Sequence, residues 1–208
     1  MIIYPKKYKK IILIGWDYDL INELRSNNIF IHGYTSDKKK TDTYKYLGSI
    51  KNIKSIDKKI GMLIPDSDIE LKSYVFKKFK SQVCTFKSRY SIIPNLKKIG
   101  IGSIIQSNVF VSENSLIGKC VKINVGSQIH HDTIIGDFSI LGPRVTILGN
   151  SIIGQKTFIG AGAIIKNKIK IAEKSFIGMG SVVVNDTKKG TYFGNPAKKV
   201  RKKIIFKN

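Results

Sequence analysis

The chain has 208 residues, 42% of them hydrophobic and 25% charged, which is typical of a folded protein with a core. Its formal charge of +23 at pH 7 comes almost wholly from lysine and is spread along the chain, without the clustered arginines and aromatic residues that base or RNA recognition favours. Composition therefore argues against a nucleic-acid-binding protein, although the positive field should attract anionic small molecules such as nucleotides.

No apolar run approaches the length that a membrane-spanning helix needs, and the first residues, MIIYPKKYKKIILIG, lack the apolar core and cleavage site of a signal peptide. We therefore expect no membrane insertion and a cytoplasmic location. The two cysteines, Cys84 and Cys120, are far apart and have no metal-ligand spacing around them. We expect buried or idle thiols at these positions, and no disulfide framework or zinc site.

Strand and helix patterns alternate in the first part of the chain. Short apolar runs predict strands, and apolar residues at helical spacing predict helices between them. The alternation predicts a small parallel sheet, and hence an α/β Rossmann-like half domain over residues 1–92 that binds the substrate. A domain that serves only for packing is the alternative, because a fold does not by itself give a function. In chain order the predicted elements are a strand in KKIILIG, a helix in DLINELRSNN, strands in IFIHGYTSD and KIGMLIPDSD, a helix in IELKSYVFKKFKS and a strand in QVCTF.

From Ile99 to Val183 an aliphatic residue stands at every sixth position, and a small or β-branched residue follows four places later in nearly every case. A helix cannot use a period of six and a simple strand would show two, so the pattern predicts a solenoid with one straight segment and one corner per repeat. Three such hexads form one triangular coil. The repeats predict a parallel β-helix of about five coils over residues 93–188, on the order of 25 Å long, with Pro94 in the linker and residues 189–208 as a cap or tail.

Several motifs resemble those of one protein family: YLGSIKNI in the first domain, then IHHDTIIGDFSILG, LGNSIIGQKTFIGAGAII, FIGMGSVVV and GNPAKKV. Together they resemble the hexapeptide-repeat acyltransferases, whose fold is a left-handed β-helix, and specifically the bacterial sugar acyltransferases of the NeuD and PglD type. The resemblance covers both halves of the chain. It implies transfer of an acetyl group from acetyl-coenzyme A to an amino or hydroxyl group of a bacterial sugar, for surface polysaccharide biosynthesis. It also implies a homotrimer with sites between adjacent prisms, and no metal.

His130 and His131 follow the inward-facing Ile129 and are expected on or beside the outer face, where a substrate can reach them. An imidazole with a pKa near 6.5 can take a proton from an amine or hydroxyl, which is worth about a hundred- to ten-thousandfold in rate. In the resembled family the base is the histidine followed by an acid, which implies His131 as the base and Asp132 as its orienting carboxylate. The family more often has glutamate at the second position. His130 is then a contact to the acceptor or to a neighbouring subunit, and two plain surface histidines are the alternative reading of the spacing.

Adding eighteen to a residue number moves one coil along the predicted prism, so His131 leads to Gly149 and its neighbour Asn150. A glycine there leaves the face open to a thioester, whose carbonyl a backbone amide can polarise. We expect the pantetheine arm of the coenzyme to continue along the exposed backbone of the later corners, and the basic residues near the end of the chain to contact its phosphates. The alternative explanation is structural: glycines are also needed at the corners of the prism, and exposed lysines and arginines are also explained by solvation alone. The further cofactor candidates are Gly160, Ala161, Gly162, Gly178, Met179, Gly180, Lys198, Lys199 and Arg201.

In the resembled family the first strand leads into a turn that binds the sugar or its nucleotide. Here the turn reads GWDYDL, and only Gly15 matches. Trp16 is expected either to stack on a base or to fill the domain interface. Ser36 and Asp37 match places where the family carries residues that hold the nucleotide. The sequence leaves open the sugar, its nucleotide, and N- versus O-acylation, so a sialic acid O-acetyltransferase remains an alternative.

Two rivals belong to other functional classes. A metal hydratase on the same fold needs three histidine ligands per metal ion. This chain offers only His32, His130 and His131, and the first of these lies in another predicted domain. A non-catalytic solenoid that serves as a scaffold or binding surface is the second rival, and binding of acetyl-coenzyme A separates it from an enzyme.

Overall fold

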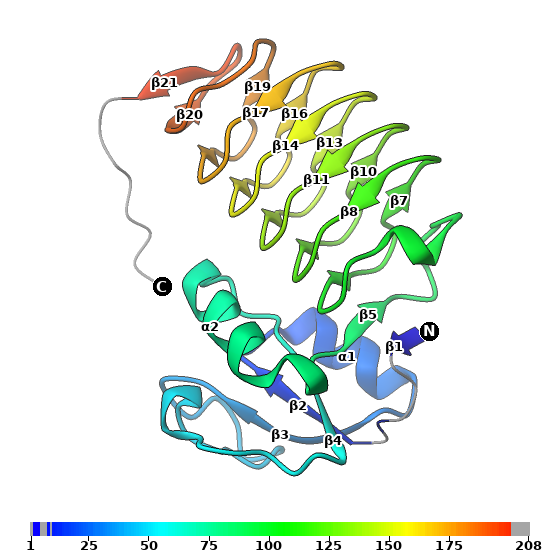
Figure 1. Ribbon diagram of the computed structural model, residues 1–208, viewed down its shortest axis with the longest axis vertical. Helices are drawn as coiled ribbons and strands as arrows, with labels where there is room; N and C mark the ends of the chain where they lie inside the picture. The colour runs from blue at the N-terminus through cyan, green and yellow to red at the C-terminus, as the bar shows by residue number, and fades with distance from the viewer. Residues whose placement is uncertain (1, 5–7, 9, 201–208) are drawn as a thin grey trace.

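The structure is a computed structural model that describes residues 2–4, 8 and 10–200 of the chain. A small α/β unit lies at one end of a stack of triangular coils, and the last strands, β20 (Thr191–Phe193) and β21 (Lys198–Val200), lie at the other end (Figure 1). Among the described residues no helix is long and apolar enough to cross a membrane. Cys84 and Cys120 are both buried thiols, as predicted.

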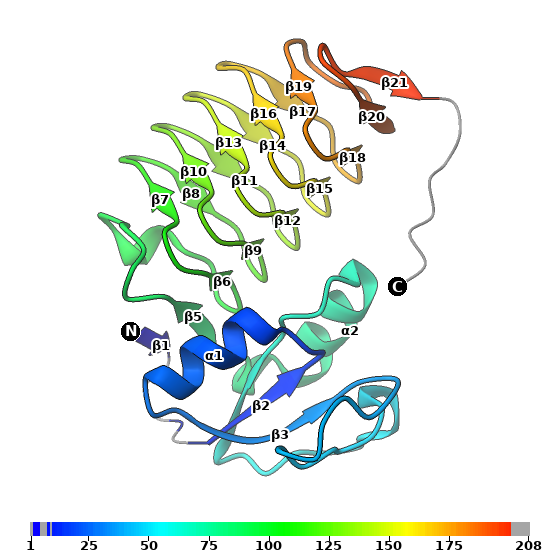
Figure 2. The same ribbon diagram turned by 180° about the vertical axis from the view of Figure 1, so that it is seen from behind.

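The small unit is built on three parallel strands in the order β3-β2-β4. Alternate residues of the central strand β2 face opposite sides of the sheet, because successive side chains of a strand alternate. Ile11 and Leu13 pack in one buried cluster with α1, while Ile12 and Ile14 pack in another with α2. The two helices therefore cover opposite faces (Figure 2). The elements are β2 (Lys10–Ile14), α1 (Tyr18–Ser26), β3 (Phe30–Thr35), the 3-10 turn η1 (Ile50–Asn52), β4 (Ile60–Leu63), α2 (Ile69–Phe79) and the 3-10 turn η2 (Lys80–Gln82).

The strand predicted in QVCTF is found in part, since Thr85 and Phe86 lie in a strand, but its expected place in this small sheet is wrong. Val83 makes one isolated bridge with Met62, and the chain then turns away. The strand that contains the end of QVCTF, β5 (Thr85–Lys87), pairs with β1 (Ile2–Tyr4) on one side and with the first coil of the prism on the other. The hydrogen bonding of the prism thus reaches back to β5, whereas the domain boundary predicted between residues 92 and 93 stays a prediction.

Beyond β5 the chain forms a three-sided parallel β-helix, which confirms the meaning of the sixfold repeat. Strands one coil apart pair in register with a shift of eighteen residues, as Gln128 does with Thr146. The first face continues from β5 through β6 (Ile104–Ile105), β9 (Lys122–Ile123), β12 (Ile140–Leu141), β15 (Phe158–Ile159) and β18 (Phe176–Ile177) to β20 and β21. The second face holds β7 (Phe110–Val111), β10 (Gln128–Ile129), β13 (Thr146–Ile147), β16 (Ile164–Ile165) and β19 (Val182–Val183). The third face holds β8 (Leu116–Ile117), β11 (Ile134–Ile135), β14 (Ile152–Ile153) and β17 (Lys170–Ile171), and the 3-10 turn η3 (Leu96–Lys98) precedes the first coil.

Every sixth residue from 102 to 180 adopts a left-handed backbone conformation, which turns the chain at each corner. Glycine and asparagine tolerate this region best, yet Phe138 and Lys168 also occupy it. The next residue is buried and is small or β-branched, and at many corners it is a serine. Ser127 Oγ, for example, donates to the Gly142 carbonyl at 3.0 Å and accepts from the Val145 N–H at 3.3 Å. These hydroxyls satisfy backbone groups inside the corner, which explains the small polar residues in the repeat.

Candidate active site

The three edges of the prism carry different residues. We call the edge between the second and third faces the histidine edge; it comprises residues 112–115, 130–133, 148–151 and 166–169. The edge between the first and second faces is the glycine edge, residues 106–109, 124–127, 142–145, 160–163 and 178–181. Both edges border the second face, the sheet β7-β10-β13-β16-β19.

His131 and Asp132 form a hydrogen-bonded pair at the histidine edge. His131 Nδ1 lies 2.8 Å from Asp132 Oδ2. Asp132 holds the left-handed turn position, with φ of +56°, which brings its short side chain back toward the preceding residue. The His131 hydrogen bond, aided by one from Asn114, lowers the pKa of Asp132. The side chains are 56% and 45% exposed, so the imidazole stands at the surface with its Nε2 turned away from the carboxylate.

The ring of His131 lies against the backbone of Gly149, one coil further along. A Cβ placed on Gly149 would lie 2.6 Å from His131 Nε2 and 2.7 Å from its Cε1, closer than non-bonded atoms can approach. Only glycine therefore leaves room for this ring position. Among the described residues no group accepts a hydrogen bond from the Gly149 N–H. The imidazole thus lies against a residue whose backbone N–H is free.

Backbone hydrogen bonds to the coils on both sides hold this turn in place. Asp132 N–H donates to the Glu113 carbonyl at 3.1 Å, and Asn150 N–H donates to the His131 carbonyl at 3.0 Å. From inside the corner, Ser115 Oγ donates to the His130 carbonyl at 2.8 Å. The pair therefore sits on a rigid repeat, as a preorganised catalytic group requires.

His130 lies beside the pair but takes no part in it. Its ring packs against the ring of Phe110, with centroids 6.4 Å apart and steeply inclined planes. It is half-buried on the side of the second face. Its predicted role as a contact to an acceptor or a neighbouring subunit stays a prediction.

The cofactor candidates fall into two separate groups. Gly149 and Asn150 share the histidine edge with His131, whereas Gly160, Ala161, Gly162 and Met179 lie on the glycine edge, across the second face of the prism. The expectation that one pantetheine arm passes both groups along one line of stacked corners is therefore wrong for a single prism.

The glycine edge is open at two of its turns. Gly162 and Gly180 have φ of +68° and +64°, and a Cβ added to either would meet nothing within 4 Å. Met179 is 68% exposed between these turns. Gly160 is different, because a Cβ there would lie 2.5 Å from the Met179 backbone nitrogen, so its glycine serves the packing of the coils.

Lys198 and Lys199 lie in β21, at the far end of the prism, and both are exposed. Lys198 pairs with Phe193 of β20 in an antiparallel hairpin. Arg201 lies outside the described residues. The basic candidates are thus several coils away from His131 along the prism axis (Figure 1).

Gly15 and Trp16 follow β2 and begin the GWDYDL turn. Gly15 has φ of +94°, and a Cβ there would lie 2.7 Å from the side chain of Asp66, so glycine is required for two reasons. The Trp16 ring packs edge-on against Tyr34, with centroids 4.6 Å apart, and touches Tyr18 as well. Trp16 is half-buried, and its Nε1 is buried with no hydrogen-bond partner among the described residues.

Ser36 and Asp37 follow β3 and lie near the Trp16 turn, since the parallel strands β2 and β3 end at the same edge of the sheet. The Ser36 hydroxyl donates to the Lys38 carbonyl within its own loop, and the Tyr46 hydroxyl donates to the Ser36 carbonyl at 3.0 Å. Asp37 is exposed. The structure thus gathers the acceptor candidates of the first domain at one edge of the small sheet.

The sequence did not reveal how the small domain is attached to the prism. Asp17 caps α1 by accepting from the Leu20 N–H at 2.9 Å, and its other oxygen lies 2.7 Å from Lys122 Nζ on the first face. Gln106 of the glycine edge also donates to Asp17. This buried ion pair places the GWDYDL turn beside the start of the glycine edge. An aspartate at the start of a predicted helix indicates a helix cap, but it does not predict an ion pair with Lys122.

Metal ligation has little support in this arrangement. Within the described part of the chain no three His, Cys, Asp or Glu side chains gather as a metal site would need. His32 lies in β3 of the small domain and the histidine pair lies on the prism. The three histidines therefore do not form a ligand set.

Residues 114–149 match the sequence profile of the family described as bacterial transferase hexapeptide (six repeats). The chain therefore carries the hexapeptide repeat of bacterial transferases, in agreement with the sequence resemblance. No curated protein sequence matches the chain.

Solved structures with a similar fold include three proteins from different organisms. Perosamine N-acetyltransferase from Caulobacter crescentus, a variant of which was solved with CoA and GDP-perosamine, is 20% identical with a TM-score of 0.84, covering 93% of this chain and 97% of that one. The acetyltransferase domain of PglB from Neisseria gonorrhoeae, solved with acetyl coenzyme A, is 18% identical with a TM-score of 0.78, covering 93% and 100%. WeeI from Acinetobacter baumannii is 22% identical with a TM-score of 0.77, covering 91% and 99%. These matches extend over both the small domain and the prism, so the chain has this two-part fold.

Proposed function

We propose that this chain is an acetyltransferase that moves an acetyl group from acetyl-coenzyme A to an amino or hydroxyl group of a nucleotide-linked bacterial sugar. The observation that carries the proposal is the His131–Asp132 pair beside the free N–H of Gly149. The similar structures add to it, since one was solved with CoA and GDP-perosamine and another with acetyl coenzyme A.

His131 acts as the general base. Asp132 accepts the Nδ1 proton and so leaves the Nε2 lone pair free to take a proton. As the acceptor nitrogen or oxygen attacks the thioester carbonyl, it loses that proton to Nε2. The new bond to the carbonyl carbon forms, the carbon–sulfur bond breaks, and the proton held by His131 passes to the departing thiolate. No metal takes part in these steps.

Gly149 is the electrostatic partner of the base in this proposal. Its N–H has no partner among the described residues and the residue lies against the His131 ring, so this N–H can donate to the thioester oxygen as negative charge develops there. Removal of one such donor typically costs about a hundred- to a thousandfold in rate. Asn150, on the next position of the same edge, completes the cofactor side of the site.

We propose further that the working site forms between two copies of the chain in a homotrimer. The histidine edge and the glycine edge border the same face, so a threefold axis facing that face would bring the histidine edge of one copy against the glycine edge of the next. The coenzyme would then contact Gly149 of one copy and Gly162 of the other. Phe110 and Ile164 are exposed apolar side chains of that face and are available for burial between copies.

The acceptor site in this proposal lies at the edge of the small sheet where β2 and β3 end. Trp16 offers an aromatic surface, and Gly15, Ser36 and Asp37 surround the same edge. Since Asp17 ties this turn to Gln106 on the glycine edge, the acceptor site stands near the edge that meets the histidine edge of a neighbouring copy. His130 would contact the acceptor there.

Thiol release from acetyl-coenzyme A, measured with a panel of nucleotide-linked amino sugars and free sialic acids, tests the proposed reaction. We expect release with at least one amino sugar nucleotide and no release without an acceptor. Release only with free sialic acids would favour the O-acetyltransferase alternative. Absence of both turnover and calorimetric binding of acetyl-coenzyme A would favour a scaffold and overturn the proposal.

Mixed trimers test the shared site. Gly162→Phe should block the coenzyme while the turn persists, because Phe138 occupies the same left-handed position in another coil. A mixture of His131→Ala and Gly162→Phe chains, unfolded and refolded together, should regain about one quarter of wild-type activity, since one interface in four combines two intact edges. A mixture as inactive as its parts would place the whole site within one chain.

A further inference from the structure

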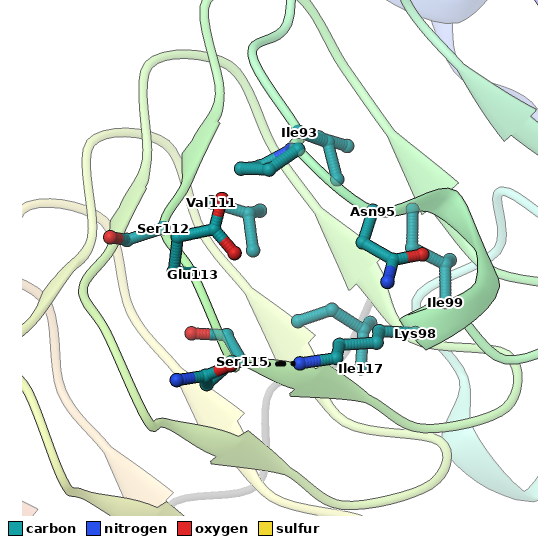
Figure 3. Close-up of a pocket in the computed structure, with 11 residues that line it drawn as sticks. Ile93, Asn95, Lys98, Ile99, Val111, Ser112, Glu113, Ser115 and Ile117 are labelled. Atoms are coloured by element: carbon teal, nitrogen blue, oxygen red, sulfur yellow. Dashed lines mark hydrogen bonds between the residues drawn. The ribbon is translucent and has the colours of Figure 1, made fainter.

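Lys98 and Asn114 lie beside the His131–Asp132 pair although no motif marks them. Asn114 holds the left-handed turn position, with φ of +60°, one coil before Asp132 on the histidine edge. Lys98 ends η3, and its Nζ donates to Asn114 Oδ1 at 3.2 Å. Figure 3 shows Lys98 extending from the η3 turn across the end of the prism toward the corner of Ser115, where the dashed line marks this hydrogen bond.

The two charges on either side of Asn114 fix the orientation of its amide. An asparagine amide has one oxygen that accepts and one NH₂ group that donates. With Oδ1 taken by the Lys98 ammonium, the NH₂ group is left to donate, and Asp132 stands in the same turn position on the next coil of this edge. The flipped amide would set its oxygen against the carboxylate and its NH₂ group against the ammonium, and would be repelled at both ends.

Asp132 needs such a second partner. Its side chain is 45% exposed, and its direct contact is the hydrogen bond to His131. The hydrogen bond from His131 contributes most to the lowered pKa of Asp132, and the hydrogen bond from Asn114 and the charge of Lys98 act in the same direction. The carboxylate is thus held between an imidazole on one side and an amide on the other.

We propose that Asn114, held by Lys98, is a positioning residue that fixes the Asp132 carboxylate and through it the tautomer of His131 with the proton on Nδ1. Its effect on turnover rests on the proposed function. Its effect on the tautomer does not, since it concerns the protein alone. Without the amide, the exposed carboxylate turns into solvent and His131 divides between two tautomers, of which the one with the proton on Nε2 cannot act as a base.

Asn114→Gly tests the amide while it keeps the turn, because glycine adopts this backbone conformation freely. Lys174→Gly is the matched control, since Lys174 is exposed, has φ of +54° and occupies the same turn position on the third edge of the prism, outside the proposed site. The nitrogen chemical shifts of the His131 ring, measured by NMR at pH 8 without substrate, report the tautomer. We expect Nδ1–H in the wild type and in the control, and a mixture in Asn114→Gly. An unchanged tautomer in Asn114→Gly would overturn the proposal.

Kinetics provide the second readout. Asn114→Gly should lower kcat about threefold to tenfold and leave the KM for acetyl-coenzyme A unchanged, because the lost bond is one exposed hydrogen bond to a charged group. Lys98→Met should lower kcat less and in the same direction, and its neighbour control Lys97→Met should not. Wild-type kcat in Asn114→Gly contradicts the proposal. If the wild type releases no thiol with any acceptor, the proposed function fails, while the tautomer measurement still decides the role of Asn114.

Discussion

Gly149→Ala probes the contact between the catalytic imidazole and the coil beside it. The added methyl carbon would lie 2.6 Å from His131 Nε2, whereas non-bonded carbon and nitrogen atoms need about 3.5 Å. The ring must therefore move by about 1 Å or rotate away, which breaks its 2.8 Å contact with Asp132 Oδ2. A displacement of this size at a reacting group can cost about a hundredfold in rate.

Stability should respond in the opposite way. Gly149 does not have a positive φ, so alanine fits its backbone and reduces the freedom of the unfolded chain by about 0.4–1 kcal/mol. Urea unfolding and thiol release, measured on wild type, Gly149→Ala, His131→Ala and the double variant, separate the two effects. In the His131→Ala background the alanine at position 149 should cost no further activity. A Gly149→Ala enzyme with wild-type kcat would refute the assigned ring position, and equal additional loss in the double variant would refute the coupling.

Three further substitutions test buried polar side chains of the small domain and of the prism corners. Lys72 is fully buried with no hydrogen-bond partner for its Nζ among the described residues, and burial lowers its pKa to about 8. Below pH 8 the charged lysine costs the folded state about 3 kcal/mol, and this cost disappears as the pH rises from 8 to 10.5, because the unfolded chain then binds more protons. Urea unfolding should show Lys72→Met more stable than wild type at pH 7 with a difference that shrinks by pH 10; a constant or negative difference would contradict a buried charged lysine. Ser115→Ala should lose about 1–3 kcal/mol of stability, as Ser139→Ala should, because both serines satisfy buried backbone groups. Only Ser115→Ala should also lower kcat, since only Ser115 supports the His130 carbonyl, and equal kcat in both variants would show that this corner does not position the base.

The β-helix could be predicted because one side chain in six must point into a narrow prism, and that requirement leaves an unbroken aliphatic period in the sequence. Ile129 and Ile147 are fully buried and pair in register one coil apart. The same arithmetic places Gly149 beside His131, because residues eighteen apart stack. It also separates the two edges: Ala161 is 161 − 131 = 30 residues after His131, which is not a whole number of coils.

Contacts between distant segments could not be predicted in this way. The QVCTF segment has the short apolar pattern of a buried strand, and such a pattern fits either sheet, so its place beside the first coil depended on tertiary packing. The pairing of Asp17 with Lys122 joins two segments with different periodicities, and neither pattern names the partner. The position of Asn114 next to Asp132 could have been predicted, because residues eighteen apart stack. Its role could not, because an asparagine at a left-handed turn is explained by the turn alone.

The central claim is that His131 takes the proton of the acceptor. Its most direct test is single-turnover acetyl transfer under saturating acetyl-coenzyme A and acceptor, followed from pH 5 to 9 for wild type and His131→Ala. We predict that His131→Ala transfers acetyl groups about a hundred- to ten-thousandfold more slowly than wild type across this pH range. A His131→Ala chain that binds acetyl-coenzyme A and transfers acetyl groups at the wild-type rate would contradict the account.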